Sequence, residues 1–295
     1  MTRNPGAATL PEVIDRTLEP LIPSATARAL VGVIDAGVVS IDGPHPRISA
    51  CLDRVSLVDE NLDTLPKGGE LGPSDGHGTF VIGRILQETS DVQIMSRRGL
   101  DAEGFDADTM VATRLAAFTA LDPSVRPQVV NLSFYGAETE PPEGIGHALL
   151  DLLDAAPDLV VVTSAGNRWT SVPPWPAAFH RDLLRHRDRL VAVGAVDTSI
   201  RWSPDLREPP RASFSNFWSG IQLWAPGVRV VGPYVRAKDD AYEFCTAVWS
   251  GTSFAAATVT GVLARGVQSG ERAPDVLADL ASHGPVVLAA DTAWE

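Results

Sequence analysis

The chain has few cysteines, no long apolar run and little positive charge. Only two cysteines, Cys51 and Cys245, occur in 295 residues, which excludes a disulfide-stabilised scaffold and a zinc site of four thiolates. Its 24 basic and 37 acidic residues give a formal net charge of −13. Because phosphate backbones and anionic lipids attract basic proteins, we expect neither nucleic acid nor a membrane as a partner.

The N-terminal region also lacks the pattern of a secretion signal. Such a signal has a continuous apolar core of about 7–15 residues, but acidic residues and prolines interrupt residues 1–28 throughout. No stretch of about 18 uncharged apolar residues occurs elsewhere, which excludes a spanning helix. We therefore expect a cytoplasmic protein, and a secreted protein that has lost its signal is the alternative.

Short valine-rich segments alternate with helical patterns along most of the chain. The segments are apolar on both faces, which is typical of strands in a buried parallel sheet. They cover residues 30–34, 92–95, 129–134, 159–163 and 190–196. Helical spacing of apolar residues follows from Asp106 or Asp108 to Leu121, then over 143–156, and again over 273–281. This alternation predicts an α/β fold: a three-layer sandwich with a mostly parallel central sheet.

Two of the strand and helix boundaries carry residues suited to acid–base chemistry. Asp35 ends the first predicted strand, at the sheet edge where α/β folds place their ligands. His77 lies between two glycines in Gly76-His77-Gly78-Thr79 and opens a helical pattern. Each observation alone also fits an ordinary structural role, because a strand-end aspartate commonly caps a loop and a histidine can simply be buried.

Two further boundaries carry a hydroxyl and an amide. Ser253 follows Gly251 and Thr252 at the start of a small-residue helix, where backbone N–H groups favour developing negative charge. Asn167 follows a buried strand and a glycine turn, and its amide could donate to an oxyanion. The alternatives are that Thr252 or Ser253 only caps the helix and that Asn167 only forms a turn.

Together these motifs resemble those of the subtilisin-like serine peptidases, the subtilases. Asp, His and Ser occur in the order typical of subtilisin, not in that of chymotrypsin or the α/β-hydrolases. The resemblance rests on IDAG at 34–37, GHGT at 76–79, VVNLS at 129–133, AGN at 165–167 and SGTSFAA at 250–256. It spans about residues 28–270 and implies a subtilisin-like peptidase domain over 28–295, preceded by an N-terminal extension over 1–27.

The resemblance also implies the roles of individual residues. Ser253 would be the nucleophile, His77 the general base and acid, and Asp35 the group that orients His77. Asn167 would contribute to the oxyanion hole. The residues expected to line the substrate are Ser133, Phe134, Tyr135, Gly136, Ser164, Ala165, Gly166 and Arg168.

Several positions depart from the family pattern. Tyr135 replaces a glycine that in relatives borders the primary specificity pocket, so we expect a narrowed or reshaped pocket. Arg168 follows Asn167, and we hypothesise that it favours an acidic side chain before the scissile bond. Arg47 replaces a calcium-binding aspartate; arginine offers no oxygen ligand, so we expect no calcium there and no other cofactor or metal. Residues 18–23 faintly resemble an extension that covers the active site of intracellular relatives.

The function predicted from these features is that of a serine endopeptidase with narrow specificity for a protein or leader peptide. The alternative is a non-catalytic peptide-binding module on the same fold, with Tyr135 blocking the cleft. A lipase or esterase is disfavoured because residues 251–255 lack the second glycine of a nucleophile elbow.

Overall fold

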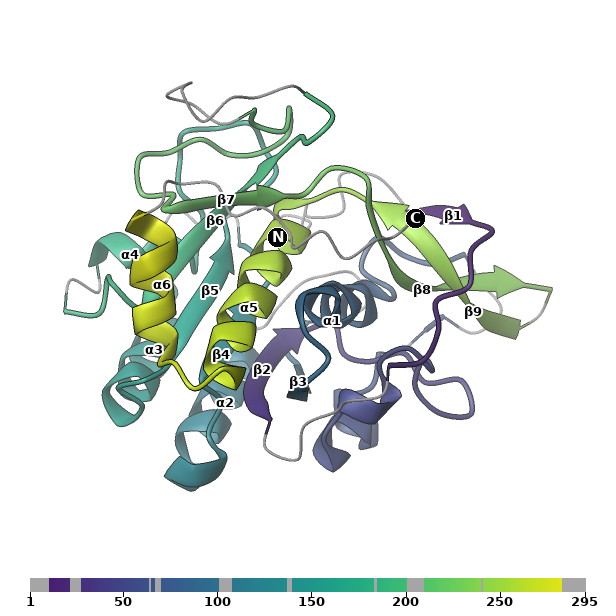
Figure 1. Cartoon of the computed structure of the whole chain (residues 1–295), viewed down its shortest axis with the longest axis horizontal. Helices are drawn as coiled ribbons and strands as arrows, with labels where there is room; N and C mark the ends of the chain where they lie inside the picture. The colour runs from purple at the N-terminus through teal and green to yellow at the C-terminus, as the bar shows by residue number, and fades with distance from the viewer. Residues whose placement is uncertain are drawn as a thin grey trace.

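A six-stranded parallel sheet forms the centre of the computed structural model (Figure 1). Its order is β3 (Val92–Arg98), β2 (Ala29–Asp35), β4 (Val129–Leu132), β5 (Val160–Ser164), β6 (Leu190–Val196) and β7 (Leu223–Pro226), and all neighbours pair in parallel. The five predicted strands are confirmed, and β7 is an addition. The structure describes residues 11–21, 28–63, 65–66, 70–100, 108–136, 140–182, 185–200, 210–239 and 241–282.

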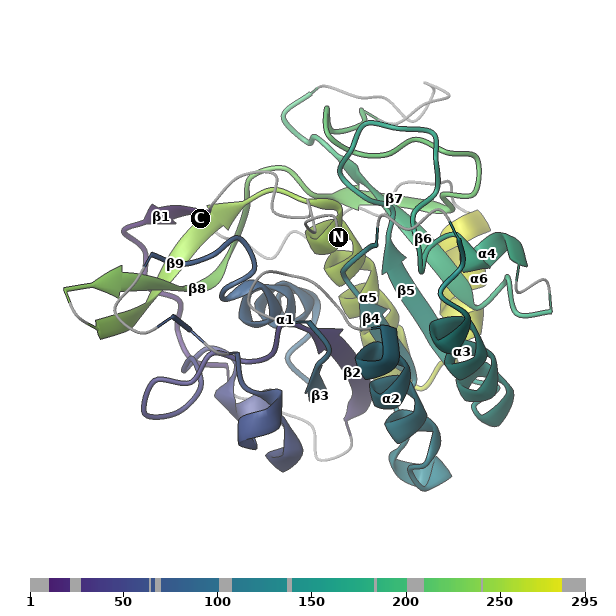
Figure 2. The ribbon, with the colours of Figure 1, turned by 180° about the vertical axis from the view of Figure 1, so that it is seen from behind.

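Helices cover both faces of this sheet, as Figures 1 and 2 show. One face carries α1 (His77–Glu88), α5 (Thr252–Gln268) and α6 (Ala273–Ser282), whose apolar side chains share a core with the sheet. The other face carries α2 (Asp108–Thr119) and α3 (Glu143–Ala155), which form a second core. The predicted three-layer α/β sandwich and its helices are therefore confirmed. The short α4 (Phe179–Asp182) lies near β6.

The helix α5 runs through the interior because its sequence allows it. From Thr252 to Ala264 every residue is buried, and most of them are alanine, glycine, threonine or valine. Small side chains let the helix backbone approach the sheet closely on one side and α1 on the other. The start of this helix therefore lies at the carboxyl edge of the sheet, among the ends of β2, β4 and β5.

A second, antiparallel sheet was not predicted. It contains β1 (Glu12–Ile14), β9 (Ala241–Trp249) and β8 (Val230–Lys238), in that order. Its strands alternate buried and exposed positions less regularly than an ideal hairpin, and β8 contains Pro233, which weakens the strand signal. The second strand of this hairpin, β9, ends at Trp249, and Ser250 then leads directly to the start of α5.

Residues 16–21 of the N-terminal extension lie away from the start of α1. Glu12–Ile14 forms β1, and residues 16–21 lie beside the C-terminal end of α1, near Leu86 and Ser90. His77 lies at the opposite end of that helix. The idea that residues 18–23 cover the active site is thus wrong for 18–21, and residues 22–23 lie outside the described residues.

The connecting segment after β2 contains three short 3-10 helices, η1 (Ser49–Cys51), η2 (Arg54–Leu57) and η3 (Asp59–Asn61); a fourth, η4 (Pro123–Val125), follows α2. Across the ranges given above, no helix is both long and apolar enough to cross a lipid bilayer.

Candidate active site

Asp35 and His77 form a buried pair at the carboxyl edge of the sheet. The Asp35 side chain is fully buried, and its Oδ1 lies 2.7 Å from His77 Nδ1. The same Oδ1 accepts a hydrogen bond from the backbone N–H of Ala36 at 2.8 Å. A carboxylate bound to Nδ1 favours the tautomer whose other ring nitrogen, Nε2, can accept a proton.

Backbone packing around glycines brings the two residues together. Gly76, before His77, has a φ of +75°, a left-handed conformation that favours glycine. A Cβ on Gly78 would lie 2.2 Å from the carbonyl oxygen of Gly37, so only glycine permits this approach of the helix start to the loop after Asp35. The backbone conformation at Gly76 and the close packing at Gly78 therefore explain why glycines stand on both sides of His77.

Aromatic rings enclose the imidazole of His77. Trp249 meets it edge-on at a centroid distance of 5.4 Å, and Phe254 lies at 5.6 Å. His77 is only 3% exposed, and its Nε2 makes no hydrogen bond to any described residue. A low-dielectric surround of this kind strengthens the bond between His77 and Asp35.

Ser253 lies in the first turn of α5 and its hydroxyl bonds to a neighbouring strand end. Its Oγ donates to the carbonyl oxygen of Ser133 at 2.9 Å, and Ser133 Oγ donates to the carbonyl oxygen of Ser253 at 3.0 Å. The structure thus places Ser253 beside the substrate strand predicted from sequence. Ser253 Oγ makes no hydrogen bond to His77, whose Nε2 has no hydrogen-bond partner among the described residues.

Asn167 is held by the residue before the predicted nucleophile. Its Oδ1 accepts from the backbone N–H of Thr252 at 2.9 Å and from Thr252 Oγ1 at 2.8 Å. Thr252 Oγ1 in turn accepts from the N–H of Gly166 at 3.2 Å, where φ is +96°. These bonds fix which end of the Asn167 amide is oxygen, and they aim its NH₂ group away from Thr252.

Tyr135 lies against the same turn. Its hydroxyl accepts a hydrogen bond from the backbone N–H of Asn167 at 3.2 Å, and its side chain is 4% exposed. The guanidinium of Arg168 lies over the Tyr135 ring at 5.7 Å from the centroid. Burial raises the pKa of the Tyr135 hydroxyl well above its usual value, so the group stays protonated at neutral pH. The Tyr135 side chain is therefore buried beside Asn167 and held there by a hydrogen bond.

The other residues predicted to line the substrate are mostly buried among protein groups. Phe134 packs in the second core, Ser164 Oγ donates to the Phe134 carbonyl at 3.3 Å, and Ala165 is fully buried. The N–H of Gly136 donates to the carbonyl of Trp175 at 2.9 Å. Any substrate contact of Phe134, Ser164 and Ala165 would have to use main-chain groups. Their predicted role stays a prediction.

Sequence reasoning missed Asn216, which braces the turn around Asn167. Asn216 Nδ2 donates to the carbonyl of Ala165 at 2.8 Å, and its backbone N–H donates to the carbonyl of Gly166 at 2.9 Å. Its Oδ1 accepts from the N–H groups of Arg168 and Thr170 at 2.9 and 3.2 Å. Asn216 follows directly after Ser215 in a loop, and nothing in the local sequence indicates a partner 48 residues away.

Thr252 was also missed as a functional residue, because it was considered only as a helix cap. The N-cap residue of α5 is Gly251, and the Thr252 side chain instead links Asn167 to Gly166. The sequence feature that could have indicated this role of Thr252 is its place between Gly251 and Ser253.

Arg47, which replaces the calcium-binding aspartate of relatives, binds a backbone group of the protein. Arg47 Nη1 donates to the carbonyl of Glu19 at 2.8 Å. Within the described part of the chain, no three or more His, Cys, Asp or Glu side chains are grouped as metal ligands would be. Both cysteines are free, and burial raises the pKa of each thiol to about 11, which makes them poor nucleophiles.

A parallel α/β sheet with an Asp–His pair, a helix-start serine and a braced asparagine at one edge defines the architecture of a subtilisin-like peptidase. The family model for the Subtilase family matches residues 27–275, and the chain belongs to this family. The predicted membership in a family of serine peptidases is therefore confirmed.

Curated relatives and a solved structure agree with this family. The extracellular serine proteinase of Thermus sp. (strain Rt41A) is 28% identical over 211 residues, 70% of this chain and 45% of the relative. The thermophilic serine proteinase of Bacillus sp. (strain AK1) is 28% identical over 248 residues, 79% of this chain and 51% of the relative. The chain thus spans about half the length of these two relatives. Subtilisin DY of Bacillus licheniformis is 27% identical over 81% of this chain and 76% of the relative.

The crystal structure of a cold adapted subtilisin-like serine proteinase superposes with a TM-score of 0.62 at 23% identity, covering 93% of this chain and 91% of the other. At this identity the likeness establishes the fold, and the fold agrees with the prediction.

Proposed function

We propose that this chain is a serine peptidase that hydrolyses peptide bonds through an acyl-enzyme. The observation that carries the proposal is the buried pair of His77 Nδ1 and Asp35 Oδ1 at 2.7 Å, whose imidazole lies 5.6 Å from the ring of Phe254, the residue after Ser253. The three side chains come from different elements that meet at one edge of the sheet. A protein or peptide is the corresponding substrate.

In the proposed reaction, Ser253 Oγ attacks the carbonyl carbon of the scissile bond. His77 Nε2 takes the hydroxyl proton as the new C–O bond forms, and Asp35 stabilises the resulting imidazolium. His77 then gives the proton to the leaving amine as the C–N bond breaks. Water, deprotonated by His77, hydrolyses the acyl-enzyme and restores the serine. Before the attack, the Ser253 hydroxyl must turn from the Ser133 carbonyl toward His77, since catalytic hydrogen bonds often tighten only with substrate bound.

The oxyanion would be stabilised by two donors. The Ser253 backbone N–H lies in the first turn of α5, where N–H groups have no intrahelical acceptor. The Asn167 NH₂ group is the second donor, and its orientation follows from the two Thr252 bonds to Oδ1. Donors fixed before the reaction need no reorganisation when negative charge develops.

We further propose that Tyr135 makes the specificity narrow. Its ring occupies the position where relatives carry glycine, and its hydroxyl is tied to Asn167. A pocket narrowed in this way accepts a small side chain at the position before the scissile bond. Arg168 is exposed and lies over the same ring, so it could also pair with an acidic side chain. A peptide library digested by the wild type, Tyr135→Gly and Arg168→Ala separates these effects. Tyr135→Gly should admit larger residues, and no loss of acidic preference in Arg168→Ala would remove Arg168 from the proposal.

Labelling by a fluorophosphonate probe tests the peptidase proposal itself. The wild-type protein should be labelled and Ser253→Ala should not, while Ser133→Ala controls for a second serine in the same place. Absence of labelling in correctly folded wild type would instead favour the non-catalytic peptide-binding module. The probe needs no knowledge of the natural substrate, so a narrow specificity cannot cause a false negative through substrate choice.

A further inference from the structure

A third carboxylate lies beside the pair of Asp35 and His77. Asp63 is 8% exposed, and its Oδ2 accepts the backbone N–H of Gly76 at 2.7 Å. Gly76 is the residue before His77 and adopts the left-handed conformation that starts α1. Asp63 comes from a different segment, 13 positions earlier, and acts as a cap supplied from outside the helix.

The segment of Asp63 is also bound to the loop after Asp35. Val38 N–H donates to the carbonyl of Asn61 at 3.2 Å, and the N–H of Asp63 donates to the carbonyl of Val38 at 2.9 Å. A Cβ on Gly37 would lie 2.6 Å from the Asn61 carbonyl oxygen. Three backbone segments thus meet: the loop after Asp35, the segment before Asp63 and the start of α1.

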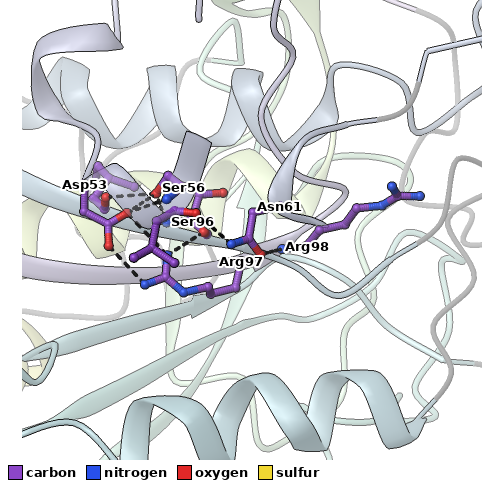
Figure 3. A network of polar contacts seen from close by, with 8 residues as sticks. Asp53, Ser56, Asn61, Ser96, Arg97 and Arg98 are labelled. Carbon is purple, nitrogen blue, oxygen red and sulfur yellow. Dashed lines mark hydrogen bonds and ion pairs between the residues drawn. The ribbon is translucent and has the colours of Figure 1, made fainter. Parts of the chain in front are cut away.

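A polar network holds the segment that leads to Asp63 (Figure 3). Asp53 accepts a hydrogen bond from Arg97 Nη2 at 3.0 Å, and Ser56 Oγ accepts from the N–H of Ser96 at 2.8 Å. Asn61 Oδ1 accepts from the N–H of Arg98 at 3.2 Å. All three donors belong to β3, the strand that pairs with β2 and its terminal Asp35. The position of Asp63 is therefore fixed relative to Asp35 by the sheet itself.

The electrostatic surroundings of Asp63 are dominated by burial. Burial raises the pKa of the carboxyl to about 7; the hydrogen bond from Gly76 opposes the rise, Asp75 adds to it, Arg98 opposes it and Asp35 adds to it. The hydroxyl of Tyr234 is a further titratable neighbour, because Asp63 is among the charges that raise its pKa. The charge of Asp63 thus changes in the pH range in which histidines titrate.

We propose that Asp63 is a positioning residue for the active site: its carboxylate ties the helix start that carries His77 to the loop that carries Asp35, and its negative charge favours the imidazolium of His77. The inference rests on the proposed peptidase function, because the pair it positions is the proposed acid–base machinery. It assigns a role to a residue outside every motif of the family resemblance.

Two variants separate the hydrogen bond from the charge. Asp63→Asn keeps an oxygen that can accept the Gly76 N–H but removes the charge, whereas Asp63→Ala removes both. Asp59→Ala is the matched control, because Asp59 is exposed on the same segment. The second-order rate constant of fluorophosphonate labelling is measured against pH for each variant, and near-ultraviolet circular dichroism establishes that each is folded.

The expected results differ between the two variants. Asp63→Asn should keep the plateau rate within about 3-fold and move the acid limb to lower pH, since the Asp63 carboxylate, charged above its pKa of about 7, stabilises the imidazolium. Asp63→Ala should lower the plateau by about 10–100-fold, because the helix start is no longer fixed. Asp59→Ala should match the wild type. A wild-type plateau in folded Asp63→Ala, or an unmoved acid limb in Asp63→Asn, would overturn the inference; if Asp63→Ala does not fold, the Asp63→Asn limb decides.

A second measurement keeps this inference distinct from the peptidase proposal. The His77 imidazole is titrated by NMR in Ser253→Ala, with and without Asp63→Asn, which requires no activity. If the wild type is not labelled, the peptidase proposal fails. The titration still decides on Asp63: a His77 pKa lowered by Asp63→Asn supports the electrostatic role, and an unchanged pKa refutes it.

Discussion

Replacing Gly78 by alanine should separate His77 from Asp35 without destroying the fold. The added Cβ would lie 2.2 Å from the Gly37 carbonyl oxygen, whereas ordinary van der Waals contact begins at 3.4 Å. The difference, 3.4 − 2.2 = 1.2 Å, is the distance by which the start of α1 and the loop after Asp35 must move apart. The position of a Cβ is set by its own backbone and the Gly37 carbonyl is a backbone group, so no side-chain rotation can relieve the overlap.

This displacement acts directly on the proposed acid–base pair. The His77–Asp35 hydrogen bond is 2.7 Å long, and lengthening it by about 1 Å removes it as a hydrogen bond. A misplacement of about 1 Å in a catalytic group costs about 10²-fold in rate. Alanine favours the helix by about 1 kcal/mol over glycine, which partly offsets the steric cost to stability. We therefore expect a loss of activity larger than the loss of stability.

The assay compares Gly78→Ala with Gly144→Ala in α3. A Cβ on Gly144 would meet only the Cβ of Ala112, at an ordinary 3.8 Å. Gly144→Ala should keep the wild-type labelling rate and have an equal or higher Tm, while Gly78→Ala should be labelled about 10²-fold more slowly. A wild-type labelling rate in folded Gly78→Ala would refute the reasoning, because it would mean that the loop can yield without moving Asp35.

Three other predictions concern groups around the site. Asn167→Ala should lower kcat by about 10²–10³-fold with little change in KM, the size found for one oxyanion donor in a subtilisin. Burial lowers the pKa of His45 from 6.5 to about 4, so stability should fall as pH drops through this range; the loss is about 3 kcal/mol at pH 4, and His45→Gln should lack it in thermal melts. Arg84→Met should destabilise by about 3 kcal/mol in denaturant unfolding, because it leaves the buried Glu88 carboxylate without its nearest cation, and adding Glu88→Gln should recover most of the loss.

The central sheet could be predicted from sequence because its strands are buried on both faces. Valine-rich runs such as 160–164 fit few structures other than a buried strand, and the helices between them carry apolar residues at regular spacing. The hairpin of β8 and β9 could not, since it is covered on one side only and contains Pro233. Strand β1 has only three residues, too few for any periodicity to be visible.

The proposed catalytic residues could be placed from sequence because each lies in a short motif. In most of these motifs a glycine close to the catalytic residue is required by the local backbone conformation or packing. The residues that brace them could not. Asn216 acts on Ala165 from 51 positions away, and Asp63 acts on Gly76 from a segment of irregular structure. An asparagine or aspartate in a loop has many ordinary uses, so only the tertiary fold distinguishes these two from others of their kind.

The position of the Ser253 hydroxyl follows from the same burial that makes the site effective. Ser253 is 1% exposed, so an unpaired hydroxyl there would cost about 1–3 kcal/mol. The Ser133 carbonyl meets this need at 2.9 Å from a strand end fixed by the sheet. Turning the hydroxyl to His77 exchanges one buried acceptor for another, so the step needs little energy. The hydrogen bond from Ser253 to the Ser133 carbonyl is therefore compatible with a nucleophilic role. It satisfies the buried hydroxyl when no substrate is bound, so that the serine does not destabilise the start of α5.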